Sequence, residues 1–173
     1  MRQVFRSFFV AAFALMLAAC SPKYNWRETH GDKLPFTVLL PAKPSSFTRQ
    51  IDLNGMPVSM TMTAAEIDGV TFAVGVAELA DAAQTSKALA SMRTALLNNI
   101  GGSPSQTAIP GRVTDSNQII DVAATGVARG QTMLLMARLT AKDKRIYQVL
   151  IVGPEKAIST ENAETFFTSF KPG

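Results

Sequence analysis

Alternating apolar and polar side chains predict that β-strands fill most of the chain from residue 34 onward. An opening apolar run ends at Pro41, and three strand-like segments then follow: Ser46 to Leu53, Met56 to Glu66 and Val70 to Leu79. Asn54-Gly55 and Asp68-Gly69 separate these segments. Both pairs favour two-residue hairpin turns because Asn, Asp and Gly adopt positive φ angles at low cost. The pattern predicts an antiparallel meander with one buried face.

A helix is expected after the third strand. Asp81 to Gln84 is typical of a capping box, and Gly101-Gly102 is typical of a helix end. Between them the apolar side chains recur every three to four residues, at Leu89, Met92, Leu96 and Ile100. This spacing predicts one apolar stripe that packs on the sheet.

The second half of the chain repeats this plan. Strands are expected near Ala108 to Val113 and at Gln118 to Val127, Gln131 to Thr140 and Arg145 to Val152. The last two are apolar on both faces, so we expect them at the centre of the sheet. The charged run from Lys142 to Arg145 is interpreted as a solvated hairpin tip, with a binding patch as the alternative. A final helix near Ser159 to Phe170 carries Phe166, Phe167 and Phe170 on one face.

The fold class expected from this order is α+β, with an antiparallel sheet built from two β-β-β-α halves and helices packed on it. The opening PFTVLLPAKP and the closing YQVLIVGP and AETFFTSFKP resemble PsbP/Mog1-like domains of secreted and lipid-anchored bacterial proteins. In those domains a strand that ends in proline begins the domain, and a phenylalanine-rich helix closes it. Fold does not imply function, so the resemblance assigns no functional residue.

Residues 1–19 have the parts of a secretory signal peptide. Arg2 and Arg6 precede a run of 12 residues from Phe8 to Ala19 without a polar side chain, which is too short to span a bilayer. Leu17-Ala18-Ala19-Cys20 then resembles the lipobox of bacterial lipoproteins. The resemblance implies that Cys20 is acylated, that the chain is cut before it, and that Ser21 directs the protein to the outer membrane, facing the periplasm. A plain signal peptide with a stray cysteine is the alternative.

The signal peptide is therefore followed by a lipid-anchored tether, residues 20–33, and by one domain, residues 34–173. Tyr24 and Trp26 are expected to dock on the domain; the alternative is contact with lipid headgroups. His30 lies beside Gly31-Asp32 in an expected turn, and one histidine provides neither a metal site nor a catalytic set.

Composition and motifs exclude several functions. Removal of residues 1–19 leaves 15 basic and 13 acidic residues, a net charge of +2 without a concentrated basic face, which argues against nucleic acid as a partner. The common hydrolase, phosphate-loop and metalloprotease motifs are missing. Carboxylate pairs, Glu66 with Asp68 and Asp115 with Asp121, fall at expected turns or strand ends. We interpret them as solvated, so that alanine at any of the four, or at His30, should change stability by about 0.5 kcal/mol or less.

We therefore expect no catalytic residue, no metal and no cofactor. Four methionines on expected strands are interpreted as core filler: Met60, Met62, Met133 and Met136. Two functional classes remain. The first is a non-enzymatic envelope lipoprotein that is held in the membrane through Cys20 and binds another envelope protein. The second is a lipoprotein that binds a small ligand in a groove between sheet and helices.

Overall fold

The computed structural model describes residues 23–111 and 118–173. Its strands are β1 (Arg27–His30), β2 (Phe36–Leu40), β3 (Ser45–Asp52), β4 (Pro57–Ile67), β5 (Val70–Glu78), β6 (Ser103–Pro104), β7 (Gln118–Ala128), β8 (Gln131–Lys142), β9 (Arg145–Pro154) and β10 (Lys171–Pro172). Its helical segments are η2 (Ala82–Gln84), α2 (Thr85–Ile100), η3 (Glu155–Ala157) and α3 (Thr160–Ser169).

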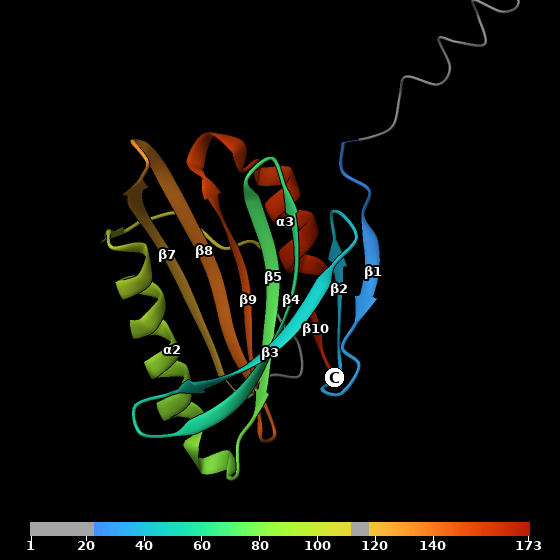
Figure 1. The fold of residues 1–173 in the computed structure, drawn as a ribbon, viewed down its shortest axis with the longest axis vertical. Coiled ribbons are helices and arrows are strands. Elements are labelled where there is room, and N and C mark those ends of the chain that lie inside the picture. The colour runs from blue at the N-terminus through green and yellow to red at the C-terminus, as the bar shows by residue number, and fades with distance from the viewer. Residues whose placement is uncertain (1–22, 112–117) are drawn as a thin grey trace, which may run out of the picture.

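Two antiparallel sheets make up the described part of the chain (Figure 1). The larger has the strand order β3-β4-β5-β9-β8-β7-β6, and the smaller has the order β1-β2-β10. The element order strand-strand-strand-helix occurs twice, first as β3-β4-β5-α2 and then as β7-β8-β9-α3. The expectation of a mixed α+β fold with antiparallel strands is confirmed.

The tight turns follow from local chemistry. Asn54 and Gly55 have φ angles of 57° and 83°, and Asp68 and Gly69 have φ angles of 52° and 74°. These values are what two-residue turns of the favoured hairpin type require. Asp143, with φ of 54°, lies at the turn from β8 to β9. The charged run at this position is therefore a hairpin tip, as the sequence predicted.

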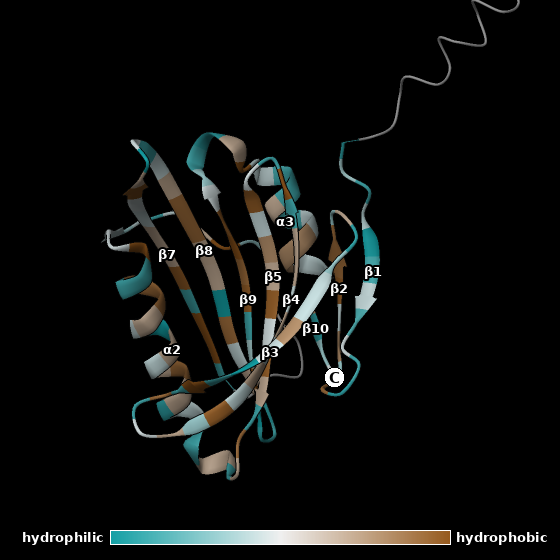
Figure 2. Ribbon diagram, viewed as in Figure 1, coloured by the Kyte–Doolittle hydropathy of each residue, from teal (hydrophilic) through white to brown (hydrophobic). Residues whose placement is uncertain are grey.

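The large sheet is covered on both faces, which gives two apolar clusters. On one face α3 and β2 pack against β5, β8 and β9, and the cluster is built around Phe72, Tyr147 and Phe166. On the other face α2 packs against β7, β8 and β9 through Leu89, Met92 and neighbouring side chains. Hydrophobic colours dominate β8 and β9 (Figure 2), and these strands lie at the middle of the sheet as expected.

Both helices begin and end near the residues that the sequence indicated. The Asp81 carboxylate accepts a hydrogen bond from the amide of Ala83, but it caps η2, so that α2 begins at Thr85. Gly101, with φ of 59°, ends α2 in the left-handed conformation. The Ser159 hydroxyl caps α3 by accepting a hydrogen bond from the amide of Asn162.

The segment before β1 packs on the domain. The rings of Tyr24 and Trp26 stack with a centroid distance of 5.7 Å, and both meet the edge of Phe72, at 6.4 Å and 5.9 Å. The amide of Asn25 donates to the carbonyl of Pro41, and Lys23 forms an ion pair with Asp68. The docking interpretation of the two aromatic residues is confirmed.

One expected strand is absent from the described residues. The sequence predicted a strand near residues 108–113, but residues 105–110 have no regular structure, and residues 112 and 113 lie outside the description. Pro110 has no amide hydrogen for a ladder bond. The carbonyls of Ile109 and Pro110 instead accept hydrogen bonds from the guanidinium of Arg138.

Candidate functional site

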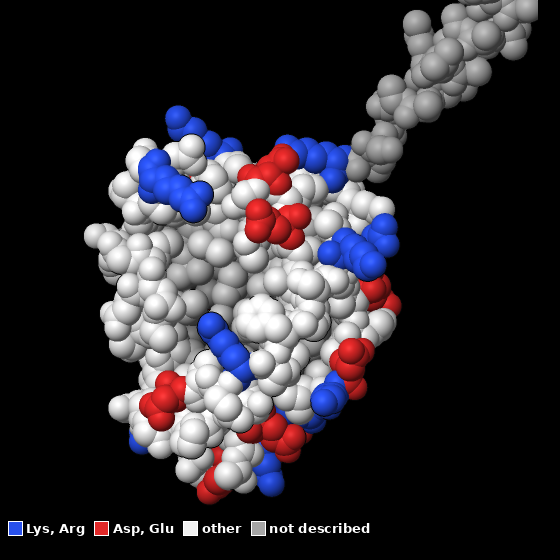
Figure 3. Space-filling model, in the orientation of Figure 1, with Lys and Arg blue, Asp and Glu red and all other residues white. Residues whose placement is uncertain are grey.

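The candidate site is an apolar trough beside the C-terminal end of α2. It has a volume of about 280 Å³ and lies between the last turn of the helix and the ends of β7, β8 and β9. Its lining consists of Leu96, Asn99, Ile100, Val127, Ala128, Met133, Leu135, Leu150 and Val152. A hollow bounded by uncharged atoms is visible on this face, with charged residues around its margin (Figure 3).

Two glycines allow the end of α2 to lie close to β7. A Cβ atom on Gly126 would clash with the carbonyl and side chain of Ile100. A Cβ atom on Gly102 would likewise clash with the backbone of Thr125. The close approach therefore requires glycine at both positions, and it fixes Ile100 as one wall of the trough.

The trough contains almost no polar chemistry. Asn99 provides the one polar side chain of its lining, and none of the lining residues is charged. Val127 stands at the margin with 75% of its surface exposed. An uncharged surface of this kind binds apolar groups through burial of area, at roughly 25 cal/mol per Å². It does not supply the convergent polar groups that usually fix a small molecule.

The methionines divide between core and trough. Met60 and Met136 are buried, 4% exposed each, and belong to the two clusters, as core filler should. Met62 is half-buried, and its sulfur lies over Gly75, where a Cβ atom would stand in its way. Met133 lines the trough. No local sequence signal separates Met133 from the other three methionines, because its place in the trough depends on how β8 packs beside α2.

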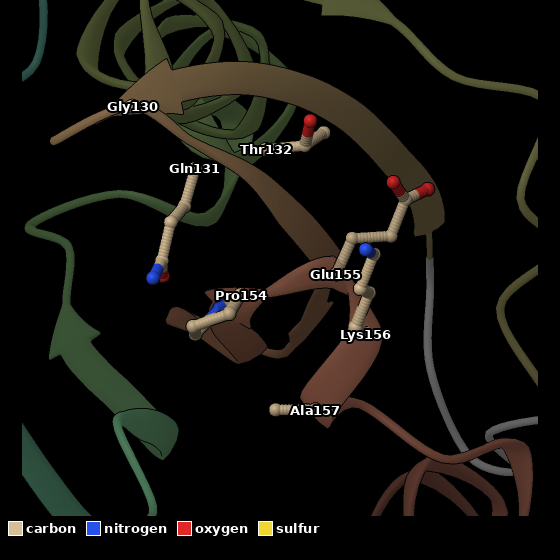
Figure 4. A pocket seen from close by; sticks show the side chains of 7 residues that line it. All are labelled: Gly130, Gln131, Thr132, Pro154, Glu155, Lys156 and Ala157. Carbon is tan, nitrogen blue, oxygen red and sulfur yellow. The ribbon is translucent and has the colours of Figure 1, made fainter.

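A second cavity, of about 480 Å³, lies between the β7–β8 turn and η3. Figure 4 shows the side chain of Gln131 on one side and those of Glu155 and Lys156 on the other. Glu155 and Lys156 are exposed. Solvated groups of opposite charge at an open cavity do not make a catalytic set.

The carboxylates that the sequence singled out do not converge. Glu66 is exposed on β4, and Asp68 lies in the next turn, where it pairs with Lys23. Asp115 lies outside the described residues. His30 is the last residue of β1 and is exposed; its Nε2 lies 3.1 Å from Oε1 of Glu28.

The carboxylate of Asp121 is exposed, as expected, but its interpretation as a group at a strand end is wrong. It is the fourth residue of β7, directly opposite Arg138 on β8. The guanidinium of Arg138 donates from Nε and Nη2 to the two carboxylate oxygens of Asp121, at 2.8 Å each. The Arg138 side chain is 4% exposed and that of Asp121 39% exposed. Asp121 thus compensates a buried charge and holds residues 109–110 in place through Arg138.

The described residues contain no group of three or more His, Cys, Asp or Glu side chains that could hold a metal ion. Among the described helices, none is long and apolar enough to cross a membrane. Cys20, Ser21 and residues 1–19, which carry the expected lipidation and sorting signals, lie outside the described residues.

Comparison of the chain with known proteins found no match. No protein-family model matches the chain, and no curated protein matches it.

Proposed function

We propose that the protein is a non-enzymatic lipoprotein of the bacterial outer membrane, and that its trough binds an apolar segment of another envelope protein. The observation that carries the binding role is the lining of the trough, which joins eight apolar residues to the single amide of Asn99. A partner of matching chemistry would present uncharged aliphatic or aromatic side chains.

Support for the anchor comes from the sequence, and its place relative to the domain follows from the ion pair of Lys23 with Asp68. The lipobox-like Leu17-Ala18-Ala19-Cys20 would attach acyl chains to Cys20, and two or three chains make such an anchor stable. Cys20 is three residues before Lys23, which pairs with Asp68 at the β4–β5 turn. Three residues span at most about 11 Å, so the anchor would hold this turn close to the membrane.

The trough lies at the same end of the sheet as that turn. In the strand register Thr71, near the start of β5, is opposite Val152, and Met133 is opposite Pro154. Val152 and Met133 both line the trough. A partner that binds there would therefore be held near the membrane surface.

The test is a photo-crosslinking amino acid placed at Ala128 in the full chain and activated in intact cells. Ala128 is exposed and lines the trough, and Ile120 is the matched control, because it projects from the same face of β7 but lies about 26 Å away along the strand. We expect a discrete crosslinked protein from position 128 and none from position 120. Equal products from both positions, or none from position 128, would contradict the binding role.

The concave shape of the trough favours a second candidate, a small apolar ligand. Its volume of about 280 Å³ is slightly below the usual range of ligand pockets, roughly 300 to 1,000 Å³. Native mass spectrometry of the detergent-extracted protein separates the two candidates. A bound small molecule that is lost in Met133→Asp would favour the ligand, and its absence would favour the protein partner.

A further inference from the structure

The strand β3 is an edge that the described residues leave unpaired on one side. It pairs with β4 along all eight of its residues and stands at the end of the large sheet. The opposite edge is better protected, because β6 pairs with β7 and the amide of Ser105 donates to the carbonyl of Ala123. Unprotected edge strands are templates for pairing with another strand.

The register shows which backbone groups of β3 point outward. The amide of Leu53 donates to the carbonyl of Met56 at 2.9 Å, so this pair is hydrogen-bonded. Bonded and non-bonded pairs alternate along antiparallel strands. Asp52 therefore stands in a non-bonded pair with Pro57, which agrees with the missing amide hydrogen of proline. By the same alternation Ser46, Thr48 and Gln50 direct their N–H and C=O groups away from β4.

The side chains of β3 also alternate. Ser46 and Thr48 bond through their hydroxyls to Thr63 and Thr61 of β4, at 2.8 Å each. Phe47 and Arg49 project on the other face, opposite Met62 and Met60 of β4. Phe47 is 52% exposed, which is unusual for a phenylalanine on an ordered strand.

We propose that two copies of this chain pair through β3 in antiparallel orientation, with Thr48 on the two-fold axis. A two-fold axis perpendicular to the sheet keeps each face of the sheet on the same side in both copies. Residues that stand opposite each other across the axis therefore project from the same face. With Thr48 at the axis, Phe47 stands opposite Arg49 of the partner subunit, an aromatic and cation pair. Ser46 then stands opposite Gln50 of the partner subunit, and both have outward backbone groups.

Charge selects this register over its neighbour. Arg49 is the only charged residue among the first seven of the strand. An axis at Arg49 would place two arginines directly opposite each other, which is destabilising. The axis at Thr48 avoids this and uses the exposed ring of Phe47. A second copy of the chain can therefore pair with this edge without bringing the two Arg49 side chains together.

Disulfide crosslinking tests the dimer in the full chain, in the cell envelope. Thr48→Cys should give a disulfide-linked dimer after mild oxidation, because its Cα atoms would be about 5.5 Å apart across the axis. Gln50→Cys is the control, because the two copies of residue 50 would be separated by about 13 Å, beyond the reach of a disulfide. The unchanged chain, with Cys20 alone, gives the background.

A mixture of two variants tests the register itself. Co-expressed Ser46→Cys and Gln50→Cys chains should crosslink to each other, and neither should crosslink alone. Thr48→Pro removes the outward amide hydrogen without touching the backbone bonds to β4; Thr48→Ala is its control, because it also loses the hydroxyl bond to Thr61 but keeps the amide. The proline variant should therefore raise the dimer dissociation constant by at least about tenfold in sedimentation of the extracted protein. Circular dichroism checks that the variant is folded.

The outcomes decide between occupants. Crosslinking of Thr48→Cys at the background level, or equal to that of Gln50→Cys, would overturn the dimer. A Thr48→Cys chain found in a disulfide with a different protein would assign the edge to that protein instead.

Discussion

Replacement of Asp121 by alanine should destabilise the domain far more than the loss of an ordinary surface carboxylate. The substitution removes two hydrogen bonds of 2.8 Å to the buried guanidinium of Arg138. Hydrogen bonds to charged groups contribute about 1.5 to 3 kcal/mol, and breaking a fully buried ion pair costs about 3 to 5 kcal/mol.

Two features place the expected value below that upper range. Asp121 is 39% exposed, so water screens the pair and can partly replace the carboxylate. Arg138 also keeps its bonds to the carbonyls of Pro110 and Ile109, at 3.0 and 3.3 Å. We expect Asp121→Ala to lower the free energy of unfolding by about 2 to 3 kcal/mol, on the order of 5 to 10 °C in melting temperature.

Urea denaturation followed by circular dichroism measures this change. Glu66→Ala is the matched control, an exposed carboxylate on the opposite half of the sheet, and should change stability by about 0.5 kcal/mol or less. The double variant Asp121→Ala, Arg138→Met should recover part of the loss because it removes the uncompensated charge. It should not recover all of it, since Ile109 and Pro110 then lose their donor. The reasoning fails if Asp121→Ala is as stable as Glu66→Ala.

Four further variants test the anchor, the sorting signal and two buried aromatic residues. Cys20→Ala should prevent acylation and leave an uncut or soluble form that no longer fractionates with the outer membrane, and Ser21→Asp should move the protein toward the inner membrane; unchanged fractionation would contradict the anchor and the sorting signal, respectively. Tyr147→Phe should lower stability by about 1 kcal/mol, because the hydroxyl donates to the carbonyl of Pro35 at 3.1 Å. Burial raises the pKa of Tyr147 above its usual value near 10. The contribution of the neutral hydroxyl to folding stability is therefore present below pH 10 and is lost as the pH rises through the higher pKa of the folded state. The melting temperature of Tyr147→Phe, measured against pH, should fall less at alkaline pH than that of the unchanged protein. Phe166→Ala should cost about 3 to 5 kcal/mol in thermal unfolding, because the ring is fully buried against Phe72 and Phe167; a cost below 1 kcal/mol would refute the packing argument.

The parts of the fold that the sequence predicted depend on neighbouring residues. Asn54-Gly55 and Asp68-Gly69 specify their turns through their own φ preferences, and Gly101 ends α2 in the same way. The nearly continuous apolar runs of β8 and β9, which predicted their central place in the sheet, are likewise visible within each segment. Such signals need no information from the rest of the chain.

The parts that could not be predicted depend on contacts across the sheet. Asp121 meets Arg138 only because β7 and β8 pair in one particular register, and a carboxylate near a strand start looks solvated without that register. The strand β1 is polar throughout, so it has no apolar period to detect. The trough combines the end of α2 with three strands, and no single segment carries its pattern.

The middle strand of the small sheet links distant parts of the chain. β2 pairs with β1 just before it and, through Thr37 and Lys171, with β10 more than 130 residues later. Gly173 also donates to the carbonyl of Pro35. A chain that is synthesised from its N-terminus therefore presents β2 long before its second partner arrives. The small sheet cannot close until residues 171–173 have emerged, so that β2 remains an open edge while the whole large sheet is being made.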